Sequence, residues 1–156
     1  MAGATKTAKI TAPKDPASKG FSEEERAAMK AAIKEYRGAR SSKHTAADDL
    51  AGVMAAIAEM PEHDRLLAER IHALVLAAAP SLAPRTWYGS PAYYKDGRLI
   101  CFFQPAAKFK TRYANFGFMQ DAKLDEGAMW PTSFAITTLT PADEERIAEL
   151  VKRAVG

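Results

Sequence analysis

Aromatic and basic side chains crowd residues 85–113, and they are the residues best suited to chemistry in this chain. Tyrosine and tryptophan with a few cations can line an amphipathic pocket, hold a small anion or stack on bases. The alternative is structural, with half of the aromatic rings in the core and the cations along a solvated strand edge. The candidate ligand-binding residues are Trp87, Tyr93, Lys108, Lys110 and Arg112.

The histidine spacing does not predict a metal site. His63 and His72 stand nine residues apart, about half a turn out of phase on a helix. Glu69 and His72 share a helix face, but a di-iron site needs a second such pair and two more glutamates. The sequence contains no Cys-x-x-Cys or His-Glu-x-x-His motif. We therefore expect no cofactor, with weak iron binding as the open alternative.

Nucleophilic catalysis has no clear motif either. Cys101 lies in an apolar run, where a thiol behaves as a small hydrophobic group. Ser90 follows Gly89 without the glycine-x-serine-x-glycine pattern of a nucleophile elbow. No glycine-rich phosphate loop is present. The sequence therefore predicts a protein that is not an enzyme.

Helix signals surround these residues on both sides. Ser22 and Glu25 fit a capping box with Phe21 as a hydrophobic staple, and the apolar stripe of this first helix is thin. Thr140 before Pro141 is a second clear helix start. Helices are expected at 22–37, at 47–59, at 62–79 with Pro61 at its first turn, and from Pro141 to the C-terminus.

Between the third and last helices the pattern changes to strands. Asp96-Gly97 between two apolar runs predicts a two-residue hairpin, because both turn positions need positive φ. An acidic loop is expected at 121–129. The order of helices, then strands, then a helix predicts an α+β fold, a small antiparallel sheet of four to five strands flanked by helices on one side. The expected strands are 85–88, 91–94, 99–104, 113–118 and 133–138.

The charge is unevenly distributed along the 156 residues. Residues 1–20 hold four lysines and one aspartate, which accounts for the whole net charge of +3. We expect this segment to be a disordered basic tail, because it lacks large apolar residues. The rest is neutral overall, so nucleic-acid binding by the body is not expected, and an accessory role of the tail in such binding is the alternative. No run is apolar enough for a membrane span, and one cysteine agrees with a cytoplasmic protein.

The chain from Glu69 onward resembles the YdhG-like family of small bacterial domains of largely unknown function. The resemblance covers about 48–156 and implies a small sheet flanked by helices, similar to frataxin. Some members are described as frataxin-like iron chaperones, and no metal ligand carries over by position. The residues that carry the resemblance are IHALV (71–75), WYGSPAY (87–93), DG (96–97), LICFF (99–103) and FGF (116–118).

The resulting organisation is a tail at 1–20, a peripheral helix and linker at 21–47, and a YdhG-like α+β domain at 48–156. The expected function is non-enzymatic binding of a small anionic or amphipathic ligand, or of a protein partner. A frataxin-like iron-delivery role is the second hypothesis. Its candidate carboxylates are Asp121, Asp125, Glu126, Asp143, Glu144 and Glu145.

Overall fold

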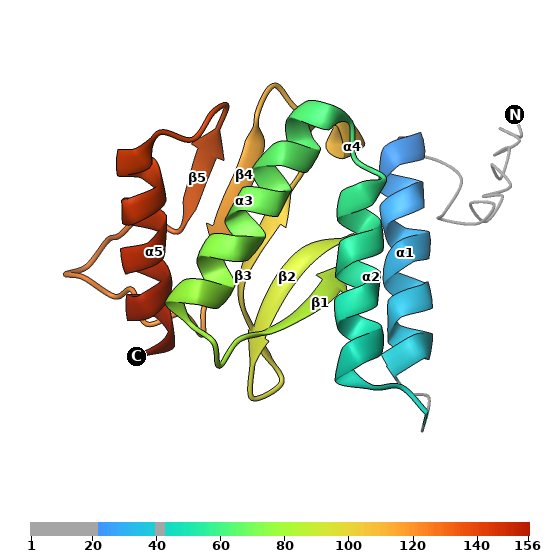
Figure 1. Cartoon of the computed structure of the whole chain (residues 1–156), viewed down its shortest axis with the longest axis horizontal. Coiled ribbons are helices and arrows are strands. Elements are labelled where there is room, and N and C mark those ends of the chain that lie inside the picture. The colour runs from blue at the N-terminus through green and yellow to red at the C-terminus, as the bar shows by residue number, and fades with distance from the viewer. Residues whose placement is uncertain (1–21, 40–42) are drawn as a thin grey trace, which may run out of the picture.

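The computed structural model describes residues 22–39 and 43–156, so the expected tail at 1–20 lies outside the described part (Figure 1). The elements follow the predicted order of helices, strands and a final helix. They are α1 (Glu23–Ala39), α2 (Ala46–Ala58), α3 (Glu62–Ala78), β1 (Ala83–Trp87), β2 (Ser90–Lys95), β3 (Arg98–Gln104), α4 (Ala106–Phe109), β4 (Ala114–Phe118), β5 (Ser133–Ile136) and α5 (Pro141–Val155).

The five strands form one antiparallel sheet in the order β1-β2-β3-β4-β5, so each strand pairs with the next one along the chain. Helices α2, α3 and α5 lie on one face of this sheet, and α1 lies beside α2 on the side away from α3 (Figure 1). The α+β class and the one-sided arrangement of the helices are therefore confirmed. Within the described ranges, no helix is long and apolar enough to cross a membrane.

Side chains on the helix-facing side of the sheet form the core. Tyr93, Phe103 and Phe116 come from three neighbouring strands and are fully buried. They pack in one cluster with apolar residues of α2, α3 and α5. The pairing shifts by one residue between Tyr93 and Tyr94, which buries both Ile100 and its neighbour Cys101.

Two hairpin turns, one at each end of β2, set the register of the first three strands. Asp96 and Gly97 have φ values of 50° and 77°, which confirms the predicted turn between β2 and β3. Tyr88 and Gly89 have φ values of 51° and 71°, so a second turn of this kind joins β1 to β2. This second turn was not predicted from sequence, because tyrosine is not typical of a position with positive φ.

Side-chain caps define the helix starts. The hydroxyls of Thr45 and Thr140 accept from the backbone N–H of Asp48 and Asp143, and both carboxylates accept in return from the threonine N–H. The Oγ of Ser22 accepts from the N–H of Glu25, as expected at the start of α1. The helical turn α4 was not predicted.

Helix α1 turns its apolar stripe outward. Met29, Ile33 and Tyr36 are 37%, 53% and 62% exposed, whereas the small Ala28 is buried. The first helix was expected to be peripheral with a thin apolar stripe, and this stripe is largely exposed to solvent. The helix packs through alanines because it approaches the β1–β2 turn closely, with Ala31 next to Gly89.

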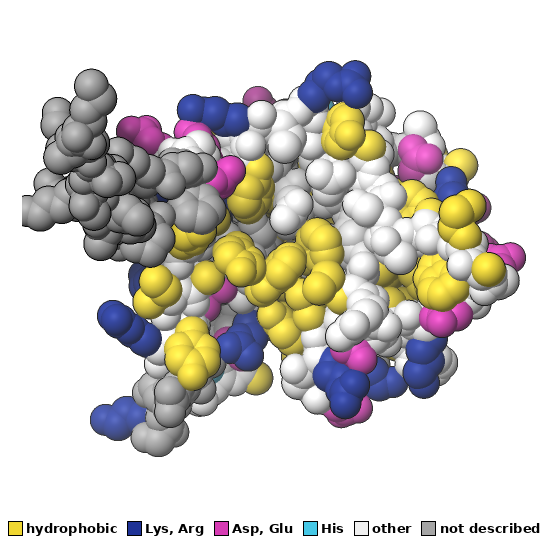
Figure 2. Space-filling view, turned by 180° about the vertical axis from the view of Figure 1, so that it is seen from behind, with side chains coloured by type: hydrophobic (Ala, Val, Ile, Leu, Met, Phe, Trp, Pro, Cys, Tyr) yellow, Lys and Arg dark blue, Asp and Glu magenta, His cyan; other side chains and the backbone are white. Residues whose placement is uncertain are grey.

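The sheet face away from the helices gathers hydrophobic side chains at its centre, with charged ones around the edge (Figure 2). The ring of Trp87 packs on that of Phe102 with centroids 5.1 Å apart. The Phe102 ring in turn lies over Gly117 of β4, where a Cβ would come within 2.4 Å of it. The guanidinium of Arg85 lies 5.6 Å from the ring centre of Tyr94.

Candidate functional site

A cleft of ≈ 320 Å³ lies where the α2–α3 linker, the β1–β2 turn and α4 meet. Its walls are mostly apolar and carry one cation, Lys108, and one carboxylate, Glu59. Such a composition suits a small ligand with an apolar body and a polar end. The lining residues are Ala56, Glu59, Met60, Pro61, Gly89, Pro105, Ala107 and Lys108.

Lys108 is the polar centre of this cleft. Its side chain is half-buried, and its ammonium donates a hydrogen bond of 2.7 Å to the carbonyl oxygen of Tyr88. Burial lowers the pKa of Lys108, while the nearby charges of Glu35 and Glu59 oppose this shift. None of the ion pairs among the described residues involves Lys108. An ammonium has three donors, so Lys108 retains donors for an incoming anion.

The β1–β2 turn supplies the opposite wall and is held from both sides. The backbone N–H of Gly89 donates a hydrogen bond of 2.7 Å to Oε1 of Glu35 on α1. The ammonium of Lys108 donates a hydrogen bond to the adjacent carbonyl oxygen of Tyr88. Tyr88 keeps a left-handed backbone at φ 51°, which costs about 1–2 kcal/mol for a bulky residue. The turn is therefore a strained segment fixed by two charged side chains.

Asp64 positions the helical turn that carries Lys108. It is 3% exposed at the start of α3, and its carboxylate accepts from the N–H groups of Ala106 and Ala107 at 3.2 and 2.9 Å. The carboxylate thus caps α4 from a distant part of the sequence. Lys110 ends this turn with a left-handed φ of 49°.

The structure does not bring the five sequence-predicted residues together. Lys108 lines the cleft, but Tyr93 is fully buried in the core, where its hydroxyl lies 2.9 Å from Nδ1 of His72. Trp87 pairs with Ser90, three residues from Tyr93 along β2, so alternation puts Trp87 and Tyr93 on opposite faces of the sheet.

The other two predicted cations also lie outside the cleft lining. Lys110 forms an ion pair with Glu24 of α1, and this contact is the main reason that the pKa of Glu24 is lowered. The guanidinium of Arg112 lies 5.2 Å from the ring centre of Tyr113. Lys110 therefore connects its turn to α1, and Arg112 packs on the neighbouring tyrosine ring.

Asp64, Gly89 and Glu59 belong to the site and were missed from sequence. The Tyr-Gly step between two apolar strands was the available signal for the turn. Pro105 followed by Ala-Ala-Lys-Phe was the available signal for α4, since proline often begins a helical turn. No local pattern indicated that Asp64 caps that turn.

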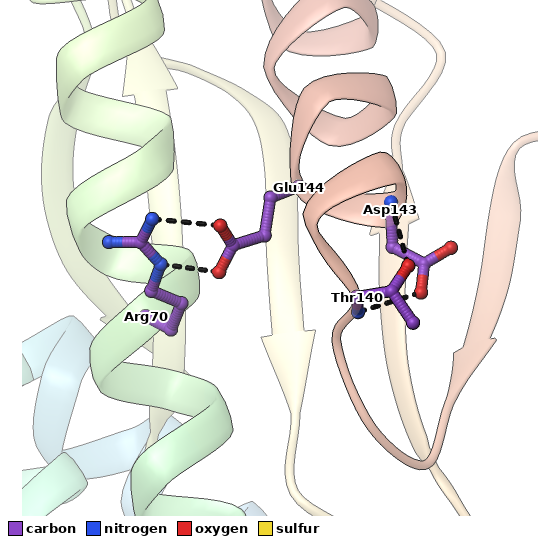
Figure 3. Close-up of polar contacts among 4 residues, drawn as sticks. All are labelled: Arg70, Thr140, Asp143 and Glu144. Carbon is purple, nitrogen blue, oxygen red and sulfur yellow. Dashed lines mark hydrogen bonds and ion pairs between the residues drawn. The ribbon is translucent and has the colours of Figure 1, made fainter.

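The candidate acidic residues are mostly engaged by cations or caps. Glu144 receives two hydrogen bonds from the guanidinium of Arg70, one of them 2.8 Å long, and Asp143 accepts from the N–H of Thr140 (Figure 3). These contacts lower the pKa of both carboxyls. In the same way Asp121 pairs with Arg98, and Glu126 lies 3.7 Å from Arg153. No group of three metal-binding side chains occurs within residues 22–39 and 43–156.

The two candidate nucleophiles are inside the protein. Cys101 is fully buried, and burial raises the pKa of its thiol. Ser90 is 2% exposed, and its Oγ has no hydrogen-bond partner in the described part of the chain. Neither lines the cleft.

No family model, curated protein or solved structure matches this chain. The candidate site therefore rests on its own geometry.

Proposed function

We propose that this chain is a non-enzymatic binding domain that takes a small amphipathic anion in the cleft beside Lys108. The observation that carries the proposal is the position of the Lys108 ammonium, half-buried in an apolar cleft and without an ion-pair partner among the described residues. A partly desolvated cation favours an anionic group, because their attraction is stronger than in bulk water. Ala56, Met60 and Pro61 would contact the apolar part of the ligand.

A carboxylate or phosphate group fits the remaining donors of Lys108. Glu59 at the same cleft disfavours a second negative charge, so a single anionic head on an apolar body is the best match. The resemblance to the YdhG-like family is compatible with such a domain, and it does not name a ligand.

The test uses octanoate as the probe, below its micelle concentration, with inorganic phosphate and octylamine in parallel. A ligand present at a hundredfold excess over its dissociation constant adds about 2.7 kcal/mol to the free energy of unfolding. Octanoate should therefore raise the melting temperature by several degrees. Octylamine should not, because its ammonium would face Lys108.

Lys108→Met is the critical variant, and Lys152→Met is its matched control on the exposed surface of α5. We expect octanoate to stabilise the wild-type chain and the control, and to leave Lys108→Met unchanged. Lys110→Ala with Arg112→Ala should retain binding, because neither residue lines the cleft. An equal response of Lys108→Met and wild type, or no response to either anion, would reject the proposal.

The same screen separates the two other hypotheses. Stabilisation by ferrous iron under anaerobic conditions, lost on replacing Asp125 and Glu126 by alanine, would support iron delivery instead. Salt-sensitive binding of short DNA that disappears on deleting residues 1–20 would support an accessory nucleic-acid role of the tail.

A further inference from the structure

Strand β5 is an outer strand of the sheet and pairs only with β4. The carbonyl oxygen of Thr132 accepts from the N–H of Phe118, which makes this a hydrogen-bonded pair at the start of the ladder. Hydrogen-bonded pairs alternate along an antiparallel ladder. The backbone groups of Phe134 and Ile136 therefore also face β4, and those of Ser133 and Ala135 lie on the free edge.

Two hollows border this strand on the side of α5. One, of ≈ 300 Å³, runs from Phe134 to Leu139 and across to Ile147. The other, of ≈ 230 Å³, lies between Trp130 and Leu150. Phe134, Arg146 and Leu150 line both hollows, so together they form one groove along the strand, which we call the β5–α5 groove.

Arg146 stands at the middle of the β5–α5 groove. Its guanidinium lies 5.2 Å from the ring centre of Phe134, which holds it over the strand. None of the ion pairs within the described ranges involves Arg146. The positive charge of Arg146 contributes to the lowered pKa of Asp143. The carboxylate of Asp143 forms its hydrogen bond elsewhere, with the N–H of Thr140 at 3.0 Å.

Besides Arg146, the second hollow carries one cation and two carboxylates, and Asp143 lines the first hollow. Arg153 lies 3.7 Å from Glu126 there, and Glu149 adds a further carboxylate. An additional acidic group is therefore disfavoured in that hollow. Arg146 is the cation left for the acidic group of a ligand.

We propose that the β5–α5 groove binds an extended peptide, which adds to β5 as a sixth strand. Ser133 and Ala135 offer the backbone hydrogen bonds, the two hollows take apolar side chains, and Arg146 pairs with an acidic side chain between them. Successive side chains of a strand alternate in direction, so the recognised pattern is apolar-x-acidic-x-apolar. This site is separate from the cleft at Lys108 and does not depend on it.

A second copy of the chain fits this edge less well than an acidic peptide. Pairing of β5 with β5 of another copy would bring two Arg146 side chains toward the same two-fold axis, where like charges repel. The experiment nevertheless includes self-association as an outcome.

The test measures fluorescence anisotropy of labelled nonapeptides, with KTVTETLTK as the main probe and KTVTKTLTK as its charge-reversed partner. An array varying the two apolar positions of the main probe is screened in parallel. We expect the glutamate peptide to bind and the lysine peptide to bind at least about tenfold more weakly. Arg146→Glu should reverse this preference, and Lys152→Glu on the same helix should leave it unchanged.

Ala135→Pro tests the strand edge, because it removes an outward N–H that β4 does not use. This variant should weaken the glutamate peptide at least about tenfold while its thermal unfolding stays close to that of the wild type. If the variant fails to fold, N-methylation of the peptide at alternate residues tests the same bonds from the other side. Affinity should then fall when the methylated N–H groups are those that face β5, and should stay unchanged when they are those that face away from it.

Three results would overturn the proposal. The first is failure of every peptide in the array to bind. The second is binding that is insensitive to Arg146→Glu and to backbone methylation. The third is sedimentation showing a wild-type dimer that Ala135→Pro converts to a monomer, which would assign the edge to self-association.

Discussion

The ammonium of Lys108 occupies the space that a side chain on Gly89 would need. A Cβ at Gly89 would lie 2.2 Å from Nζ of Lys108 and 3.2 Å from the Cβ of Ala31 on α1. This close approach joins the β1–β2 turn, α4 and α1 at one point. The geometry of the candidate cleft therefore depends on a residue with no side chain.

Gly89→Ala should destabilise the chain more than Gly97→Ala does. Both glycines have positive φ, so each alanine costs about 1 kcal/mol from backbone strain. Nothing lies within 4 Å of a Cβ at Gly97, whereas at Gly89 the ammonium of Lys108 must move away from its hydrogen bond to Tyr88, which adds about 1 kcal/mol. Urea denaturation measures both free energies of unfolding, and equal losses would contradict the close contact.

Tyr88 provides a test of the strain in the same turn. Asparagine tolerates the left-handed region, so Tyr88→Asn should relieve strain and lose the edge contact with Trp87, whose ring centroid is 5.0 Å away. The two effects are similar in size, and the net change should stay within about 1 kcal/mol. Tyr88→Val loses the same contact and places a β-branched residue at positive φ, so it should cost about 2 kcal/mol or more. A valine variant as stable as the asparagine variant would show that the turn is not strained.

Asp64 is expected to matter for both stability and ligand binding. Asp64→Ala removes the part-buried hydrogen bonds that the N–H groups of Ala106 and Ala107 donate to its carboxylate, a loss of about 1 kcal/mol for each. Asp64→Asn keeps one oxygen and should cost less. Glu62→Ala, at an exposed position of the same helical turn, is the control and should change the free energy of unfolding by less than about 0.5 kcal/mol.

The Asp64 variants also report on the position of Lys108. Octanoate binding should weaken in Asp64→Ala, since α4 loses its cap, and should persist in Glu62→Ala. Chemical denaturation gives the stability and calorimetry gives the affinity. Full octanoate affinity in a folded Asp64→Ala variant would show that the cap does not position Lys108.

His72 should make the chain less stable in mild acid. Its pKa is lowered by burial, and its Nδ1 lies 2.9 Å from the hydroxyl of Tyr93. Below its ordinary pKa of about 6.5 the unfolded chain therefore binds more protons than the folded chain, and the free energy of unfolding falls as the pH drops. His72→Gln should remove this part of the pH dependence.

The measurement is a series of urea denaturations from about pH 8 to about pH 5, the range in which histidine titrates. His63→Gln, at an exposed position on the same helix, should keep the wild-type slope. An unchanged slope in His72→Gln would mean that another group controls acid stability.

Local signals in the sequence predicted most of the fold. The caps at Ser22 and Thr140 and the apolar spacing predicted four of the helices, and Asp96-Gly97 predicted the turn between β2 and β3. These features depend on residues within one helical turn or one strand of each other, so the sequence is enough to indicate them. The Tyr88-Gly89 turn and α4 were not predicted, because a tyrosine at positive φ and a four-residue helix are stabilised by distant partners.

The site itself was decided by the tertiary structure. Trp87 and Tyr93 are close in sequence, but strand alternation and the turn between them put one on the outer face and the other in the core. Asp64 reaches Ala106 across 42 residues of sequence, and Glu35 reaches Gly89 across 54. The sequence by itself determined which segments become helices and strands and that cations are plentiful near α4. Of the five candidates, Lys108 alone lines the cleft. The packing of distant segments decided this, because the position of each side chain depends on long-range contacts that no local pattern encodes.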